Sequence, residues 1–439
     1  MEIDYYKLIS IFFSLAILGN AYIFGKAFKT FLNPPSLFSL FWFLYTFFPL
    51  IFLIDVPINP FSIIFIFLCT LFFSLSSFFF DWNKAFHLNK IKLSLDIKYL
   101  NNKFLTTTFK TTFILIFIFL VIDIKIQGFE LSSFFTDFYK SSNQFMVKRY
   151  SNEIEVNIYS QISNILNYFL VMLGGLLLGS SVKSNYVKTQ ILIASLLPSI
   201  FITLSQAAKG TILLAVFLLY GGTLITKIFN NKMELTDKKT NKVVLVIISA
   251  LIIIMYFSFM SRGLFEREND EIKKALFFYF NSYAFAHVYA FSDWFSFYVF
   301  DESFMSFNRK EMTYGFYTFM AIFKSLGSSI ETPPGIYDEY FYYKDVIRTN
   351  IYTIFRGNIL DFGILGSFIF WFIAGVFSNC IFYVILCLKK PILSIPIFII
   401  MIGYFYTSFI ISLFIWKSIF GAIILLYIIL FFNKYKFKI

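Results

Sequence analysis

The chain has 439 residues, of which 59% are hydrophobic and only 14% are charged. No water-soluble domain could bury so much apolar surface, so the composition excludes a soluble globular protein and predicts an all-α polytopic membrane protein. The net charge of +12 indicates anchoring against anionic lipid rather than nucleic-acid binding.

Transmembrane helices are predicted wherever apolar residues continue for about 20 positions, the length that crosses a bilayer core. Such runs predict about eleven helices, near residues 8–25, 35–54, 60–80, 108–126, 158–180, 189–206, 211–226, 243–260, 361–388, 391–411 and 415–432. The chain therefore divides into eight helices within 1–260, one long loop at 261–360 and three helices within 361–439. In the fifth helix, the spacing of Gly175 and Gly179 predicts a helix-packing face.

The orientation follows from the lysines, because basic residues collect in the short cytoplasmic loops of membrane proteins. The loops after the odd-numbered predicted helices hold twenty Lys and only four acidic residues. The opposite orientation would place five of these six Lys clusters in translocated loops. We therefore predict that the N-terminus and the loop 261–360 lie outside the cytoplasm, and that this loop contains short interfacial or re-entrant helices.

All six arginines lie in segments predicted to be outside: Arg149, Arg262, Arg267, Arg309, Arg348 and Arg356. Guanidinium binds phosphate through two parallel hydrogen bonds, whereas lysine suffices as a point charge at a lipid surface. The arginines together predict an anion-binding site. The alternative for any single arginine is that it is solvated or paired with one of the nearby acids.

Candidate acid-base groups are few in the outer segments. His287 is the only imidazole predicted outside and could act as a general base, or it could be a packed polar group of the aromatic belt. Glu339 and Asp361, with Asp338 and Asp345, are the rival bases, and no pair has a distinctive spacing. Lys209 lies between two apolar spans, where it either contacts a lipid diphosphate or extends to the interface.

Metal and cofactor chemistry is not predicted. The three cysteines, Cys69, Cys380 and Cys387, lack the paired spacing of a zinc or redox site, and the chain contains only two histidines. We expect no metal ion and no cofactor.

Three segments of the loop resemble a known family. They are Tyr279–Phe291, Thr313–Gly327 and Thr349–Trp371. The residues that carry the likeness are Asn350, Tyr352 and Thr353, then Asp361, Phe362 and Gly363 at the entry to a helix, with Gly315 and Thr318 upstream. In these motifs, which cover about the last 180 residues, the chain resembles the O-antigen polymerases, or oligosaccharide repeat-unit polymerases of the Wzy type. It departs from them at Lys209, where many relatives carry arginine.

The resemblance implies a glycosyltransferase of the bacterial inner membrane that acts at the periplasmic face. It transfers a growing glycan from undecaprenyl diphosphate to a new lipid-linked repeat unit, with the lipid-linked oligosaccharide, membrane lipid, a chain-length regulator and a flippase as partners. The catalytic candidates are then Arg348, Asp361, His287 and Glu339. The candidates for binding diphosphate or glycan are Arg149, Lys209, Arg262, Asn350, Tyr352 and Arg356.

Three other functions remain open from the sequence. An O-antigen ligase would use the same donor with a different acceptor. A metal-dependent lipid-sugar glycosyltransferase would show paired acids in an early outer loop, where only Glu153 and Glu155 come near that pattern. A flippase or other transporter would carry charges within its spans, but the predicted spans are nearly free of charge.

Overall fold

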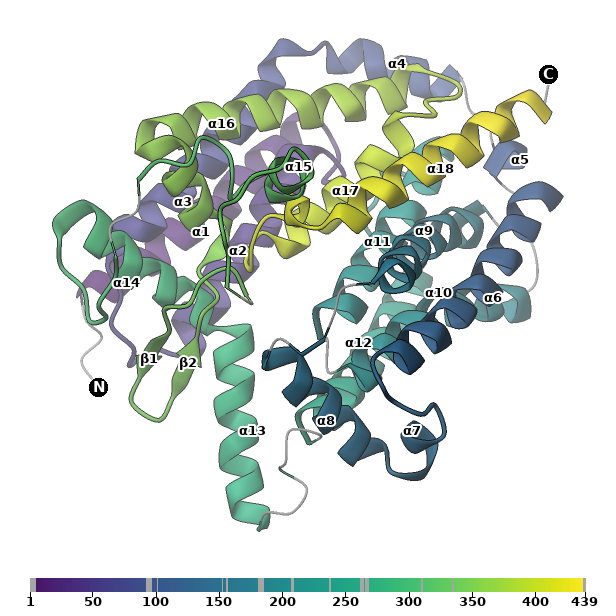
Figure 1. Cartoon of the computed structure of the whole chain (residues 1–439). Coiled ribbons are helices and arrows are strands. Elements are labelled where there is room, and N and C mark those ends of the chain that lie inside the picture. Colours follow the sequence, from purple (N-terminus) through teal and green to yellow (C-terminus); the bar gives the residue numbers. More distant parts are fainter. Residues whose placement is uncertain are drawn as a thin grey trace. The chain divides into compact units, whose positions relative to one another are not determined.

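The computed structural model describes residues 5–91, 97–100, 102–151, 153–154, 157–180, 185–206, 209–236, 238–260, 264, 268–308, 311–333 and 335–436. Contacts divide the chain into two compact units. Unit 1 comprises Met1–Asn83, Lys274–Tyr383 and Tyr404–Lys417, and unit 2 comprises Lys84–Lys273, Val384–Gly403 and Ser418–Ile439. Each unit therefore combines segments that are far apart in the sequence (Figure 1).

The first unit contains α1 (Tyr5–Ala27), α2 (Pro34–Phe52), α3 (Pro60–Leu75), η1 (Ser76–Phe79), α14 (Ala286–Phe300), α15 (Met320–Ser325), β1 (Phe341–Tyr343), β2 (Ile347–Thr349), η2 (Leu413–Ile415) and most of α13 (Asn269–Ala284) and α16 (Thr353–Cys387). The second contains α5 (Ile97–Leu100), α6 (Lys103–Ile126), α7 (Ser133–Thr136), α8 (Phe138–Tyr150), α9 (Ile158–Ser180), α10 (Asn185–Ser205), α11 (Lys209–Phe229), α12 (Lys238–Met260) and most of α4 (Trp82–Ile91), α17 (Ser394–Thr407) and α18 (Lys417–Lys436).

The prediction of a helical, polytopic membrane protein is confirmed. Among the described residues, nine helices are long and apolar enough to cross a membrane. Two shorter apolar helices, Val244–Met260 and Ser394–Thr407, fall on the predicted spans 243–260 and 391–411. The count of eleven is thus not confirmed: α17 has 14 residues, and Val244–Met260 is the apolar part of the 23-residue α12.

The segment predicted as one long loop is largely ordered into secondary structure where it is described. It forms α13, α14, α15 and the antiparallel β1–β2 hairpin, and α16 begins at Thr353 rather than near residue 361. The stretch Tyr279–Phe291 continues from α13 into α14, which packs against α2 and α3 within unit 1. Burial of one face against neighbouring helices explains why this half-apolar stretch is helical although it is too polar to face lipid.

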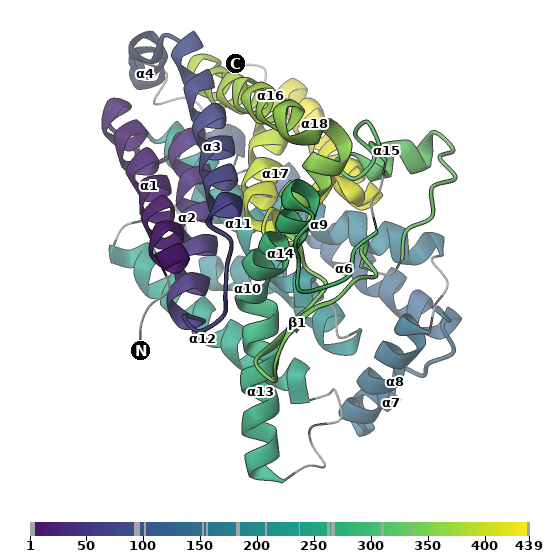
Figure 2. The ribbon, with the colours of Figure 1, turned by 90° about the vertical axis from the view of Figure 1, so that its left-hand side faces the viewer.

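Small polar residues hold α1, α2 and α3 together, and Figure 2 shows these helices side by side. The buried Asn20 amide donates hydrogen bonds to Ser39 Oγ at 2.9 Å and to Ser74 Oγ at 2.8 Å, which joins one residue from each helix. Without water as competitor, such interhelical hydrogen bonds stabilise helix association. Asn33 and Asn59 cap the starts of α2 and α3.

In unit 2, the predicted packing face on α9 is confirmed. A Cβ atom added to Gly175 would lie 2.3 Å from the Leu219 carbonyl oxygen of α11, and one added to Gly179 would lie 1.8 Å from Thr226 Oγ1. On the α11 side, Gly222 approaches the Gly175 backbone in the same way. Only glycine allows two helix backbones to approach so closely.

Candidate functional site

The candidate site lies in unit 1 at the start of α16. Backbone dihedral angles of φ 68° and ψ −178° at Gly363 break this helix, so its first turns, from Thr353 to Phe362, form a short separate segment. A residue with a Cβ atom would be strained there, which explains the glycine. The Ile354 amide donates to the Ser408 carbonyl oxygen at 2.9 Å, so that the segment is fixed to the turn after α17. This short segment carries Arg356, Asn358 and Asp361.

The Arg356 guanidinium is fully buried and is surrounded by aromatic rings. Its Cζ atom lies 4.1 Å from the ring centroid of Tyr337, 4.2 Å from that of Tyr352, 5.2 Å from that of Trp294 and 5.6 Å from that of Phe307. Cation–π attraction of this kind strengthens when water is excluded. The rings therefore form a desolvated box around a permanent positive charge.

Only one of the three Arg356 nitrogens has a hydrogen-bond partner among the described residues. Nη2 donates to Glu339 Oε2 at 3.0 Å, whereas Nε and Nη1 are buried without an acceptor in the part of the chain that the structure describes. Buried donors are nearly always satisfied in proteins, and unsatisfied ones are expensive. The Nε and Nη1 hydrogens point in different directions, on either side of Nη2, so each can donate separately to an anion oxygen.

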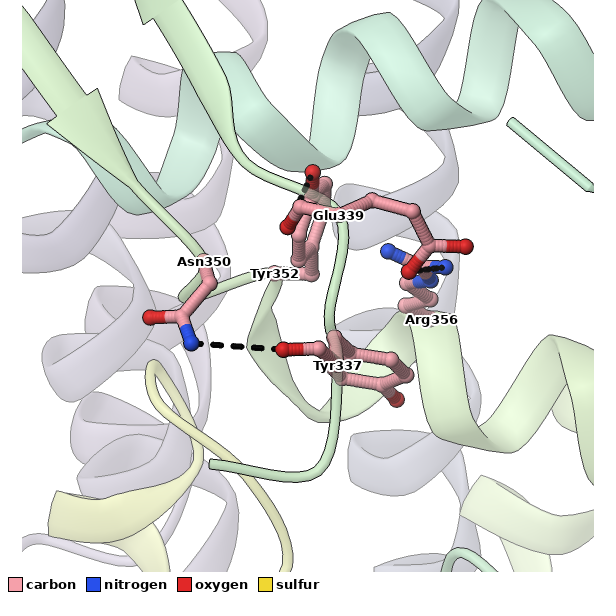
Figure 3. A network of polar contacts seen from close by, with 5 residues as sticks. All are labelled: Tyr337, Glu339, Asn350, Tyr352 and Arg356. Atoms are coloured by element: carbon pink, nitrogen blue, oxygen red, sulfur yellow. Dashed lines mark hydrogen bonds and ion pairs between the residues drawn. The ribbon is translucent and has the colours of Figure 1, made fainter. Parts of the chain in front are cut away.

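Segments on both sides of the hairpin hold this network together (Figure 3). The Tyr352 hydroxyl donates to the Glu339 carbonyl oxygen at 3.2 Å, and the Asn350 amide donates to the Tyr337 carbonyl oxygen at 3.3 Å. Glu339 reaches Arg356 from the segment before β1, as Figure 3 shows. Four residues from the sequence-based site list, Glu339, Asn350, Tyr352 and Arg356, thus lie in one network.

Arg348 faces away from this network. In the hairpin, Tyr342 pairs with Arg348 and both side chains are exposed, while Phe341, Ile347 and Thr349 face inward. The Arg348 guanidinium lies 4.9 Å from the Tyr340 ring centroid. Arg348 therefore presents a cation to solvent beside exposed tyrosines, and its catalytic role stays a prediction.

The Asp361 carboxylate lies in the same short segment of α16 but is occupied by other hydrogen bonds. Oδ1 accepts from Thr313 Oγ1 at 2.5 Å and from the Tyr317 amide at 3.0 Å. Oδ2 accepts from the Thr318 amide and the Thr318 hydroxyl, both at 2.6 Å. A carboxylate has about four lone-pair positions, and all of them are used here.

His287 is buried on α14. Its Nε2 lies 2.9 Å from the Tyr45 carbonyl oxygen, so this nitrogen carries the proton and donates it, and Nδ1 has no partner among the described residues. The ring packs edge-on against Phe409, 5.0 Å between centroids. Burial lowers the pKa of His287 to about 4, opposed by the hydrogen bond to Tyr45, so the imidazole is neutral at pH 7. This geometry favours the packed role over general-base catalysis.

Comparison with protein-family models, with curated proteins and with solved structures finds no match for this chain. The resemblance to O-antigen polymerases stays a prediction from the motifs.

Two of the other predicted ligands belong to unit 2. Arg149 is exposed in the last turn of α8. Lys209 is buried at the start of α11, with Nζ 4.2 Å from the Phe259 ring centroid. Arg262 lies outside the described residues, as does Glu155. Within the described parts of the chain, no cluster of three or more His, Cys, Asp or Glu side chains could hold a metal ion.

Sequence reasoning did not identify two residues of unit 1, one at the site and one that fixes α14. Phe307 completes the aromatic box, and nothing in its surroundings distinguishes it among 66 phenylalanines. The Lys7 ammonium is buried and donates to the Leu53 and Val56 carbonyl oxygens and to Tyr289 Oη, at 3.0, 2.6 and 2.9 Å. It thereby ties α14 to α1 and to the C-terminal end of α2. The sequence feature that could have pointed to Lys7 is that it is a lysine on the predicted outer side.

Proposed function

We propose that the protein polymerises lipid-linked glycan repeat units at the outer face of the bacterial inner membrane. The observation that carries the proposal is the Arg356 guanidinium, buried among aromatic rings with two nitrogens lacking an acceptor in the described chain. Guanidinium suits a diphosphate, and aromatic faces suit sugar rings. The donor is undecaprenyl diphosphate bearing the growing glycan, and the acceptor is a new lipid-linked repeat unit.

In the proposed reaction, a hydroxyl oxygen of the acceptor sugar attacks the anomeric carbon of the donor's reducing-end sugar. The bond from that carbon to the phosphate oxygen breaks, and its electron pair leaves with undecaprenyl diphosphate. Arg356 stabilises the charge that develops on the leaving group, because a desolvated, preorganised cation acts most strongly there. Glu339, whose carboxylate pairs with Arg356, accepts the hydroxyl proton.

Membrane orientation provides the first test, because the proposal requires the hairpin to be outside. A cysteine at position 342, which is exposed, should react with a membrane-impermeant thiol reagent in intact spheroplasts. A cysteine at the exposed position 232, in a predicted cytoplasmic loop, should react only after permeabilisation. Both variants carry serine in place of Cys380 and Cys387. The reversed labelling pattern would contradict the proposal.

The glycan products of a deletion strain test the reaction itself. Without the protein, we expect surface glycan with a single repeat unit and no ladder of longer chains on a gel. Loss of every repeat unit from the lipid core would instead indicate a ligase. Accumulation of lipid-linked repeat units on the cytoplasmic side would indicate a flippase.

A further inference from the structure

A turn next to α16 connects Asp361 to the Arg356 box. Residues 313–318 fold back onto the short segment of α16, where the Thr313 amide donates to the Leu360 carbonyl oxygen at 3.1 Å. Positive φ angles of 49° at Tyr314 and 103° at Gly315 form the turn. The four hydrogen bonds to the Asp361 carboxylate come from Thr313, Tyr317 and Thr318, so they fix both ends of this turn.

The turn presents Tyr317 to the aromatic box. The Tyr317 ring stacks on the Tyr337 ring, with centroids 5.7 Å apart and an interplanar angle of 21°, and Tyr337 is the ring nearest to Arg356. Both tyrosines pack against Gly357: an added Cβ there would lie 3.2 Å from Tyr317 Cβ and 3.5 Å from Tyr337 Oη. A continuous line of contacts therefore runs from Asp361 through Tyr317 and Tyr337 to Arg356.

We infer that Asp361 is a positioning residue for the Arg356 guanidinium: it fixes Tyr317, which holds Tyr337 against that guanidinium and keeps it out of water. The alternative of a general base requires a free lone pair, and the four accepted hydrogen bonds leave none. Asn358 and Ser412 strengthen the same turn, since they donate to Thr318 Oγ1 and to the Thr318 carbonyl oxygen at 2.9 and 2.7 Å. This positioning role of Asp361 is the same for any phosphorylated ligand that Arg356 binds. Its effect on catalysis rests on the proposed function.

Asp361→Asn is the decisive variant because it preserves the shape of the side chain. In either orientation its NH2 group faces a backbone amide that also donates, that of Tyr317 or that of Thr318, so the turn must move. Thr318→Val removes the hydroxyl but keeps the backbone hydrogen bond to Asp361, and should have a smaller effect in the same direction. Asp345→Asn is the matched control, since Asp345 is exposed near the hairpin turn.

The accessibility of Arg356 to phenylglyoxal measures its positioning directly. Purified protein in nanodiscs is treated with the reagent, and adducts are quantified by mass spectrometry, with exposed Arg348 as internal standard. We expect Arg356 to be protected in the wild type and in Asp345→Asn, and modified about tenfold faster or more in Asp361→Asn, as loss of hydrogen bonds to a charged group predicts. Unchanged protection of Arg356 in Asp361→Asn would overturn the inference.

Thr318→Val distinguishes a local displacement of Arg356 from a general folding defect. If Asp361→Asn exposes every arginine, Thr318→Val decides: selective modification of Arg356 supports the inference, and unchanged protection overturns it. Steady-state kinetics add a readout that depends on the proposed function. A positioning residue should lower kcat/KM for the lipid-linked donor, because a displaced Arg356 stabilises the leaving group less well, and leave the shape of the pH profile unchanged. A general base would lower kcat, remove the acidic limb and leave Arg356 protected.

Discussion

Arg356→Lys is expected to abolish long glycan chains and leave only single repeat units. Lysine keeps the positive charge beside Glu339, so the partly buried carboxylate retains its counter-ion and the fold is spared. It loses the planar fork, and with it the two nitrogens that lack an acceptor among the described residues. Loss of one such donor at a developing charge lowers the rate on the order of a hundred- to a thousandfold. The measurement is the chain-length ladder of a deletion strain that carries the variant.

Arg348→Lys is the comparison variant for this substitution, and it tests the catalytic role that the sequence predicts for Arg348. It makes the same chemical change in a segment that is also predicted to lie outside, but Arg348 is exposed on the hairpin. Because the Arg348 side chain is exposed, we expect a ladder close to the wild-type one, and this result would argue against the catalytic role predicted for Arg348. A normal ladder from Arg356→Lys, at wild-type protein levels in the membrane, would show that Arg356 does not bind the diphosphate.

Glu339→Gln should slow chain extension while donor binding stays within a few-fold of wild type. Glutamine keeps a carbonyl oxygen that can accept from Arg356 Nη2, but it cannot take up a proton. Removing a general base lowers the rate on the order of a hundred- to ten-thousandfold. Glutamine is preferable to alanine, because deleting one partner of a buried ion pair costs about 3–5 kcal/mol of stability. Single-turnover extension of a lipid-linked repeat unit in proteoliposomes measures the effect.

The control for Glu339→Gln is Glu331→Gln, a change at an exposed carboxylate before the site. It should extend glycan at the wild-type rate. If Glu339→Gln binds donor and also extends it at the wild-type rate, the proton must go to another acceptor. Weak binding with an unchanged maximal rate would instead restrict Glu339 to holding Arg356.

Much of the helical layout could be predicted, because long apolar runs have one stable solution in a bilayer. The packing face on α9 was equally visible, since Gly175 and Gly179 repeat at helical spacing and both approach α11. The start of α16 could not be predicted from the sequence. Its first turns carry Arg356, Asn358 and Asp361 and are less apolar than a span, so they resembled the end of a loop. They are helical because the turn after α17 and residues 313–318 satisfy their polar groups.

Side-chain roles were harder to predict than helices. Residue type predicted an arginine site, yet Arg348 and Arg356 are indistinguishable by composition, and only the alternation of the hairpin and the fold around α16 make one exposed and the other buried. Asp361 matched a catalytic motif, but its hydrogen bonds come from residues more than 40 positions earlier. No sequence spacing encodes contacts of that range.

The sequence by itself determined that the chain is a helical membrane protein and that its arginines collect in the segments predicted to lie outside, because hydropathy and residue type are local properties. The tertiary structure alone decided which arginine is desolvated, which rings surround it and which carboxylate pairs with it. Those properties depend on contacts between distant segments: Trp294, Phe307, Tyr337 and Glu339 reach Arg356 only once α14 and the hairpin have packed against α16. Burial then sets the strength of each charge, since the same guanidinium that is screened in water becomes a strong anion ligand in a dry aromatic box.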